Sequence, residues 1–247
     1  KRLAEFGADD FYNGEISEKI VSDMKTNGGW ITQEDLNDFP APKELPSLSV
    51  KHKNMIVYSQ PPPCGGWTSL LILNLLEQTS KDSIISNQDL IKALYLAHND
   101  RDKQPITDLI NYDSIAKIKL SKSYSEKLLL KEKFSGVLND KVSSGETTHF
   151  SVADTNGNAI AVTSSINAYF GALSASKELG FLYNTYMDDF IFEDPNHPFT
   201  IRPNAMAYSS MSPTIVQKNN ETVLIIGSPG SSRIISSVSQ ITAKWIN

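Results

Sequence analysis

The chain has 247 residues, of which 40% are hydrophobic and 21% are charged, a composition typical of a folded protein rather than a disordered or collagen-like chain. Its formal net charge of -5 gives no general attraction to nucleic acid or to anionic membranes, so neither is expected as a partner. The longest apolar run, around Leu70 to Leu76, is too short to cross a bilayer. A single cysteine, Cys64, excludes an internal disulfide or a cysteine-built zinc site.

The first half of the chain is predicted to be mainly helical. Apolar residues recur every four positions over 16–24 and precede Asn27-Gly28-Gly29, which is typical of an amphipathic helix with a left-handed stop. Thr32 and Asp35 have the spacing of a capping box, so a second helix is expected to begin there. A stiff turn at 61–66 precedes the first of three further helices, expected at about Thr68–Glu77, Asp89–His98 and Ser123–Lys133.

The second half changes to strands. Two β-rich runs, 148–154 and 159–166, flank Asn156-Gly157, a dipeptide typical of tight hairpins. A second strand pair, at 214–216 and 222–226, is expected to belong to the same sheet. Apolar residues then return to helical spacing, so the last segment is predicted to be a helix whose first turn is Ser228–Ser232.

Two common catalytic arrangements lack support in the sequence. Serines are abundant, but there is no Gly-x-Ser-x-Gly elbow. The histidines have no HExxH pattern and no partner at ligand spacing, so neither a metal nor another cofactor is expected. Cys64 has no identifiable base and is interpreted as a small packing residue.

The segment 145–150, Gly-Glu-Thr-Thr-His-Phe, passes from a polar loop directly into a predicted strand at a threonine. A threonine hydroxyl is a poor nucleophile unless a base lies beside it. If the peptide bond before such a threonine is cut, its own α-amine becomes that base, with a pKa of roughly 8. Strand threonines are more often structural, so this pattern alone leaves both interpretations open.

Four motifs, in order and spacing, resemble those of the γ-glutamyltranspeptidase family: Thr147–Asp154, Asn184–Phe190, Ser209–Thr214 and Gly227–Arg233. Three earlier segments are similar to the family's large subunit, namely Phe11–Gly14, Asn27–Leu36 and Tyr58–Gly66. The resemblance implies an α+β fold, a partial four-layer αββα sandwich of the N-terminal-nucleophile hydrolases, made as one precursor that cuts itself into two subunits. On that basis 1–146 is the end of the large-subunit segment, and 147–247 begins the small subunit with the nucleophile and central strands.

The resemblance also assigns the catalytic residues. Thr147 is expected to be the nucleophile, and the bond between Glu146 and Thr147 to be the autocleavage site. The same hydroxyl would attack the carbonyl of Glu146 in processing and the γ-carbonyl of the donor in turnover, forming an acyl-enzyme. Ser165 takes the place of the hydroxyl residue that hydrogen-bonds the nucleophile. Backbone N–H groups of Gly230 and Ser231, where the family usually has two glycines, are expected to open the last helix and stabilise the oxyanion.

For the donor, the resemblance assigns Asn167 and Asp189 to the α-ammonium, and Ser209 and Ser210 to the α-carboxylate. Tyr186, a further substrate-binding position, stands where the family usually has Gln or Glu contacting the α-amino group, so either recognition of that group is weakened or the pocket is reshaped. The connection 191–208 has only 18 residues, as in members that lack a lid, so longer donors such as polyglutamyl chains or peptides are expected to fit.

The family's positive residues near the α-carboxylate have no direct match. The basic residue before the serine pair is missing from 204–208, and Arg202 is the nearby candidate to replace it. An arginine supplied by the family's upstream portion has no counterpart, so the 247 residues are expected to be a fragment of a longer polypeptide. Arg101, at the end of a predicted helix, is a candidate stand-in for that arginine, but the preferred interpretation is that it complements the helix dipole or pairs with neighbouring acids.

The leading hypothesis is a self-processing enzyme that transfers or hydrolyses γ-glutamyl groups. Its donor would be glutathione or another γ-glutamyl amide, its acceptor an amino acid, a peptide or water, and its two subunits would stay paired after cleavage. Two alternatives remain open: an acylase of the same fold acting on another amide such as a glutaryl group, and a catalytically silent scaffold relative. The sequence does not separate transferase from hydrolase, and the cellular location stays open.

Overall fold

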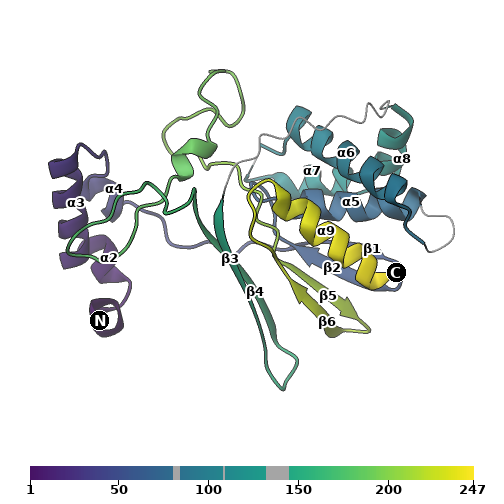
Figure 1. The fold of residues 1–247 in the computed structure, drawn as a ribbon, viewed down its shortest axis with the longest axis horizontal. Coiled ribbons are helices and arrows are strands. Elements are labelled where there is room, and N and C mark those ends of the chain that lie inside the picture. The colour runs from purple at the N-terminus through teal and green to yellow at the C-terminus, as the bar shows by residue number, and fades with distance from the viewer. Residues whose placement is uncertain (80–83, 108, 132–144) are drawn as a thin grey trace. The chain divides into compact units, whose positions relative to one another are not determined.

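The computed structural model describes residues 1–79, 84–107, 109–131 and 145–247 (Figure 1). The chain divides into two compact units, one formed by Lys1–Leu45 with Phe170–Asn184 and the other by Pro46–Tyr169 with Thr185–Asn247. This division concerns compactness, whereas the predicted boundary between 146 and 147 concerns a covalent cut, which remains a prediction. Within the described residues, no helix has the length and apolar character needed to span a membrane.

The first unit is helical. Its core joins the buried face of α3, with Ile16, Ile20 and Val21, to Leu36 of α4, and aromatic residues of 170–184 pack against it. The predicted left-handed stop at Gly28 (φ 74°) and the predicted capping box between Thr32 and Asp35 are both confirmed. The helices are α1 (Arg2–Phe6), α2 (Asp9–Asn13), α3 (Glu15–Asn27) and α4 (Gln33–Asn37).

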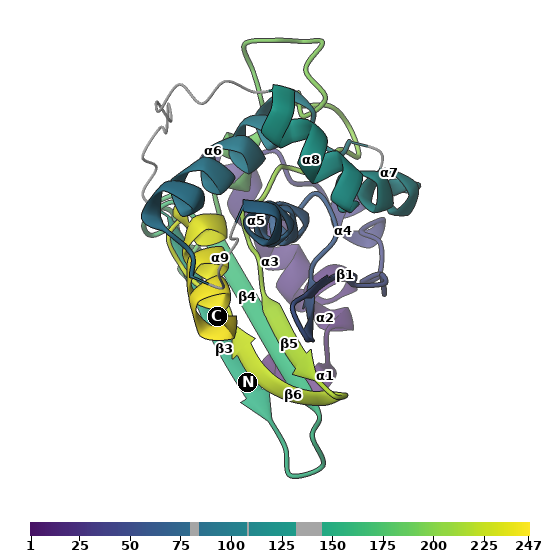
Figure 2. The same ribbon diagram turned by 90° about the vertical axis from the view of Figure 1, so that its right-hand side faces the viewer.

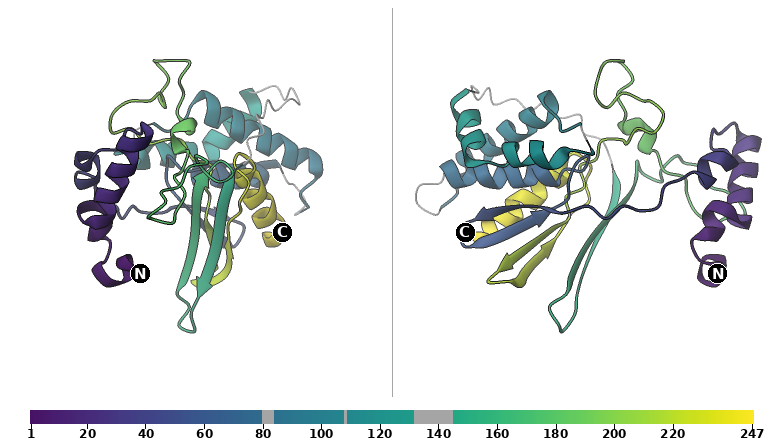
Figure 3. Two further views of the ribbon diagram at one scale, coloured as in Figure 1. Left: turned by 60° about the vertical axis from the view of Figure 1, so that its left-hand side comes forward. Right: turned by 180° about the vertical axis from the view of Figure 1, so that it is seen from behind.

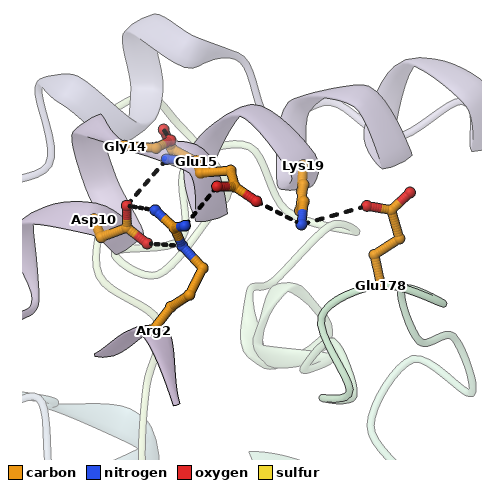
Figure 4. A network of polar contacts seen from close by, with 7 residues as sticks. Arg2, Asp10, Gly14, Glu15, Lys19 and Glu178 are labelled. Carbon is orange, nitrogen blue, oxygen red and sulfur yellow. Dashed lines mark hydrogen bonds and ion pairs between the residues drawn. The ribbon is translucent and has the colours of Figure 1, made fainter. Parts of the chain in front are cut away.

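A polar network joins the elements of this unit (Figure 4). Arg2 donates two hydrogen bonds to the carboxylate of Asp10, at 2.8 and 2.7 Å, and holds the pKa of that carboxyl below its usual range. Lys19 of α3 forms ion pairs with Glu15 at 2.8 Å and with Glu178 at 3.6 Å. The segment 170–184 is thereby tied to helices that lie more than a hundred residues earlier in the chain.

The second unit contains two separate sheets. An antiparallel four-stranded sheet has the order β1-β2-β5-β6, and among the described strands β3 pairs with β4 alone. The predicted hairpins are confirmed, but the expectation that both belong to one sheet is wrong, because β5 pairs with β2 instead. The β1–β2 hairpin, in the half predicted to be mainly helical, was not predicted. The strands are β1 (Leu48–His52), β2 (Met55–Ser59), β3 (Glu146–Ala153), β4 (Ala159–Asn167), β5 (Thr214–Lys218) and β6 (Glu221–Ile226).

Helices α5 and α9 cover one face of the four-stranded sheet, and the β3–β4 hairpin lies over the other (Figures 2 and 3). Every residue of α5 from Gly66 to Leu76 is buried, as expected of a helix that is apolar all round. The second unit therefore has the layer order helix, sheet, sheet. Its helices are α5 (Gly66–Thr79), α6 (Asn87–Lys103), α7 (Tyr112–Lys119), α8 (Lys122–Lys131), the 3-10 helix η1 (Tyr186–Asp189) and α9 (Arg233–Ile246).

The three helices predicted from periodicity correspond to α5, α6 and α8, although residues 132 and 133 of the last prediction lie outside the described residues. The terminal helix starts later than predicted. It begins at Arg233, with Ser232 as N-cap, rather than in the turn 228–232. The backbone explains the delay, because Gly230 (φ 123°) and Ser231 (φ 54°) both have positive φ values that a right-handed helix excludes.

Candidate active site

A pocket of the second unit gathers side chains from distant parts of the sequence. They come from the end of α6, the start of β3, the end of β4, η1, the segment before β5 and the turn before α9. The lining residues are Arg101, Gly145, Thr147, Ser165, Asn167, Tyr186, Asp189, Tyr208, Ser209, Ser210, Met211, Ser231, Ser232 and Ile234.

A series of hydrogen-bonded hydroxyl groups runs across the β3–β4 hairpin at the start of β3. Thr147 and Ser165 are paired across the strands, and Thr147 Oγ1 donates to Ser165 Oγ at 3.0 Å. Ser165 Oγ in turn donates to the carbonyl oxygen of Glu146 at 3.0 Å and accepts from the backbone N–H of Asn167 at 3.0 Å. A register shift between Glu146 and Thr147 brings that carbonyl within reach. Ser165 is thus placed to polarise the Glu146 carbonyl and to take part in proton transfer from Thr147.

His149 lies on the same face of β3 as Thr147, but it does not line the pocket. Its Nδ1 is 2.8 Å from Thr163 Oγ1 and its Nε2 is 3.1 Å from Ser151 Oγ. Burial lowers the pKa of the imidazole, which favours the neutral form. These contacts fit a structural histidine.

The turn before α9 lies against the segment that leads into β3. A Cβ atom on Gly145 would come within 2.9 Å of Ser231 Cβ, so the chain passes Ser231 here because residue 145 has no side chain. Ser231 lines the pocket, whereas Gly230 does not. The expectation that these two residues form the first turn of the helix is wrong, so any oxyanion donor here belongs to the preceding left-handed turn.

Asn167 and Asp189 form one side of the pocket. Asn167 Nδ2 donates to the Thr185 carbonyl at 3.1 Å, which ties the end of β4 to the residue before η1. The pKa of the Asp189 carboxyl is raised to about 6, mainly by burial; a hydrogen bond from Asn167 opposes this rise, and the nearby Asp188 adds to it. A carboxylate that burial makes costly to ionise is well suited to pair with a cation.

Ser209 and Ser210, the serine pair, form another side of the pocket, and their segment is hydrogen-bonded to the turn at 61–66. The backbone N–H of Ser209 donates to the Pro63 carbonyl at 3.2 Å, and that of Gly65 donates to the Met211 carbonyl at 2.9 Å. A Cβ atom on Gly65 would lie 2.8 Å from the Ser210 carbonyl oxygen. The turn between β2 and α5 therefore fixes the backbone of the serine pair. Burial raises the pKa of the neighbouring Cys64 thiol, which keeps it a packing residue.

Arg101 is buried in the wall next to the serine pair. Its Nη2 donates to the Ser209 carbonyl at 2.7 Å, and its guanidinium stacks 3.7 Å from the centre of the Tyr208 ring. No ion pair of the described residues includes Arg101, although the nearby Asp102 opposes the lowering of its pKa by burial, so the role as a partner of the helix dipole or of neighbouring acids stays a prediction. Arg202, the nearby candidate, is exposed, donates to the Pro198 carbonyl at 3.1 Å and does not line the pocket.

Of the residues that the sequence nominated for the site, Glu146, Gly230 and the candidate Arg202 are absent from the lining. The lining residues that the sequence did not assign to the site are Arg101, Gly145, Tyr208, Met211, Ser232 and Ile234. Most of them adjoin a nominated residue and could have been found by proximity. Arg101, a stand-in that the sequence offered and the preferred interpretation set aside, lines the pocket although 108 positions separate it from Ser209.

Comparison with known proteins gives a consistent result. A family model described as Gamma-glutamyltranspeptidase matches residues 1–247. The glutathione hydrolase proenzyme of Escherichia coli (strain K12) is 36% identical over 268 aligned residues, which cover 99% of this chain and 46% of that protein. The glutathione hydrolase proenzyme of Pseudomonas sp. (strain A14) is 35% identical, with 93% and 44% covered. The chain thus spans about half the length of the curated relatives it matches.

Among solved structures, the cephalosporin acylase from Bacillus halodurans has a similar fold, with a TM-score of 0.83. The identity is 23%, and the match covers 99% of this chain and 45% of that one. The predicted fold, a partial αββα sandwich of the N-terminal-nucleophile hydrolases, is confirmed. The family model matches residues 1–247, and two relatives are 36% and 35% identical to this chain. The chain therefore belongs to the γ-glutamyltranspeptidase family.

Proposed function

We propose that the whole protein is a self-processing threonine-nucleophile enzyme that transfers or hydrolyses γ-glutamyl groups. The observation that carries the proposal is the hydrogen-bonded series from Thr147 Oγ1 through Ser165 Oγ to the Glu146 carbonyl oxygen. It lies at the bond expected to be cut, in a pocket with carboxylate and hydroxyl groups suited to a zwitterion. The printed names of the relatives, glutathione hydrolase, support glutathione as one donor.

In processing, Thr147 Oγ1 attacks the carbonyl carbon of Glu146 while its proton passes toward Ser165. The negative charge that develops on the carbonyl oxygen is stabilised by the Ser165 hydroxyl. Collapse of the intermediate breaks the C–N bond and protonates the Thr147 nitrogen, which leaves an ester. Water then hydrolyses the ester and frees the α-amine of Thr147.

In turnover, the freed α-amine accepts the proton of the Thr147 hydroxyl as the hydroxyl attacks the γ-carbonyl of the donor. The amine leaving group departs with a proton, and the γ-glutamyl group stays on Thr147 as an ester. Water or an acceptor amine releases it. Asp189 and Asn167 bind the α-ammonium of the donor, and Ser209 and Ser210 bind its α-carboxylate.

The two chains would stay paired after cleavage because the four-stranded sheet is composite. β1 and β2 precede the proposed cut, whereas β5 and β6 follow it, and β2 pairs directly with β5. α5 from one side of the cut also packs on α9 from the other. Breaking the bond before Thr147 leaves all of these contacts intact.

The first prediction concerns the nucleophile itself. In the full-length protein, Thr147→Ala should abolish self-cleavage and lower hydrolysis of γ-glutamyl-p-nitroanilide by at least about 1,000-fold, because the attacking oxygen is lost. Mass spectrometry of the intact protein and release of p-nitroaniline measure the two effects. Thr148→Ala is the matched control, since Thr148 is the next residue, is exposed and points to the other face of β3. A Thr147→Ala protein that still divides before residue 147 would contradict the proposal.

A second candidate function is an acylase that acts on another amide, such as a glutaryl group. Tyr186 favours it, because this ring lies in the pocket wall where the family usually has an amide or acid. Comparing γ-glutamyl-p-nitroanilide with glutaryl-p-nitroanilide separates the two, since only the first carries the α-amine. If the wild type processes itself but prefers the glutaryl compound, the acylase is favoured. If it shows neither self-cleavage nor hydrolysis of either compound, the scaffold relative is favoured.

A further inference from the structure

Thr185 bonds to the end of β4 through both its backbone and its side chain, although it does not line the pocket. Its backbone N–H donates to the Ile166 carbonyl at 3.1 Å. Its Oγ1 accepts from the backbone N–H of Ala168 at 3.0 Å and donates to the Ile166 carbonyl at 3.4 Å. Its carbonyl accepts from Asn167 Nδ2 at 3.1 Å. Thr185 thus contacts three consecutive residues that lie 17 to 19 positions earlier in the chain.

The Thr185 hydroxyl does not serve the helix that it precedes. Thr185 is the N-cap of η1, a position where a threonine side chain ordinarily accepts from an N–H of its own helix. It makes no such bond here, and its oxygen is bonded to Ala168 instead. The start of η1 is tied only to the Thr185 carbonyl, which accepts from the N–H of Asp188 at 2.9 Å. The side chain therefore joins η1 to β4 rather than stabilising η1 itself.

The residue held by this contact is Asn167, whose backbone lies in the left-handed region at φ 69°. Residues with a side chain rarely adopt this conformation, so the bonds on either side must maintain it. The N–H of Asn167 donates to Ser165 Oγ, and the next N–H, of Ala168, donates to Thr185 Oγ1. The Asn167 amide donates to the Thr185 carbonyl and to Asp189. With both amide hydrogens used, the remaining polar atom of this side chain is the acceptor Oδ1, which suits an ammonium.

We propose that Thr185 is a positioning residue for the α-ammonium side of the pocket: its hydroxyl holds the end of β4 against η1, so that Asn167 and Asp189 bind the same ammonium group. The inference rests on the proposed function for the identity of the donor. Asn167 belongs to β4 and Asp189 to η1, so their separation depends on how these two elements are joined. Without the hydroxyl, the N–H of Ala168 loses its acceptor and the Asn167 amide can turn away from Asp189.

The competing explanation is that the Thr185 hydroxyl only stabilises the fold. The two explanations differ in what they predict for a ligand without an α-amino group. A positioning role affects ligands that carry the amine, whereas a purely structural role disturbs the pocket for every ligand. L-glutamate and glutarate make this comparison, because they differ only by the α-amino group.

The test measures binding of both compounds to the full-length protein by isothermal titration calorimetry. Thr185→Val, which keeps the shape but removes the hydroxyl, should weaken the binding of L-glutamate by about 10-fold and that of glutarate by no more than about twofold. Thr185→Ser keeps the hydroxyl and should bind L-glutamate within about twofold of the wild type. The matched control is Thr79→Val, since Thr79 Oγ1 bonds to the Leu75 carbonyl within α5, outside the pocket. It should bind both compounds as the wild type does.

A pH profile gives a second measurement that a purely structural role would not change. The hydrogen bond from Asn167 lowers the pKa of Asp189, so its loss should raise that pKa. The fall of kcat/KM for γ-glutamyl-p-nitroanilide at acid pH should therefore begin at higher pH in Thr185→Val than in the wild type or Thr79→Val. Asp188, the other charged group that acts on Asp189, is the same in all three proteins.

Equal weakening for the two compounds in Thr185→Val would overturn the inference, as would unchanged binding of L-glutamate or a wild type that binds no L-glutamate. If Thr185→Val does not fold, Thr185→Cys decides, because a thiol is a weak acceptor and should give the same selective loss. Since binding needs no turnover, the proposed function fails separately. A protein that shows the selective loss but releases no p-nitroaniline from γ-glutamyl-p-nitroanilide contradicts the enzyme and supports the inference.

Discussion

Asp189 carries the main pH dependence expected of the pocket. Its pKa of about 6 means that the carboxylate is ionised above that pH and mostly protonated below it. A protonated carboxyl cannot pair with the donor's α-ammonium, so kcat/KM for a γ-glutamyl donor should fall as pH decreases through about 6. Since the folded pKa lies above the ordinary value of 3.8, ionisation of Asp189 also reduces the folding stability of the protein as pH rises between these values.

The measurement is a pH profile of kcat/KM for γ-glutamyl-p-nitroanilide. Asp188→Asn should move the acid limb to lower pH, because Asp188 is one of the groups that raise the Asp189 pKa. Asp189→Asn should remove this limb and lower kcat/KM by about 100-fold through loss of the ionic partner. A limb that stays near pH 6 in Asp189→Asn would assign it to another group.

Gly145 and Ser231 should show energetic coupling, because a Cβ atom on residue 145 would meet the Ser231 side chain at 2.9 Å. Gly145→Ala should slow self-cleavage by displacing the segment that carries Glu146. Ser231→Gly removes the obstructing atom and should restore part of the rate, with a coupling free energy of about 1 kcal/mol. The rate of appearance of the two chains measures this in a double-mutant cycle. Purely additive effects would show that the contact does not control cleavage.

At the scale of elements, the turn between β2 and α5 controls the serine pair. Gly65→Ala should displace Ser210, whose carbonyl oxygen would lie 2.8 Å from the new Cβ, and raise KM by about 10-fold or more. The same Cβ would lie 2.6 Å from Ile235 Cγ1. The double variant Gly65→Ala/Ile235→Ala separates the two contacts. If it recovers the wild-type KM, the effect comes from α9 rather than from the serine pair.

Elements set by local chemistry were predictable from the sequence. The α3 stop at Gly28, the capping box at Thr32 and the β3–β4 hairpin each depend on residues within a few positions of one another. Sheet membership was not predictable in this way. The pairing of Ser59 with Thr214 joins residues 155 positions apart, and no local pattern specifies which strand a hairpin edge will meet.

The candidate site follows the same rule. Residues within recognisable motifs, such as Thr147 and Asp189, were nominated from the sequence and line the pocket. Arg101 lies outside every motif, and an arginine in the last turn of a helix has an ordinary explanation as a dipole partner. Its burial, and the absence of an ion pair with any described residue, became visible only once α6 was packed against the serine pair.

At the scale of the whole molecule, the composite sheet predicts how the cleaved protein behaves. The two chains should elute together in size-exclusion chromatography under native conditions and separate only in denaturant. Val57→Ala should weaken the pair by about 2 kcal/mol, because Val57 is fully buried and faces the equally buried Val216 across the β2–β5 pairing. The denaturant midpoint for separation measures this. Chains that separate without denaturant in the wild type would contradict it.

The β2–β5 pairing also gives a reason why the protein would be made as one polypeptide before the proposed cut divides it into two subunits. If the two halves were synthesised as separate chains, their association would depend on the concentration of each chain. It would also compete with aggregation through the exposed strand edges. A continuous polypeptide makes that encounter intramolecular, at an entropic cost that grows only slowly with the length of the intervening loop. If the proposed cut occurs, the covalent link would favour assembly and would no longer be required once assembly is complete.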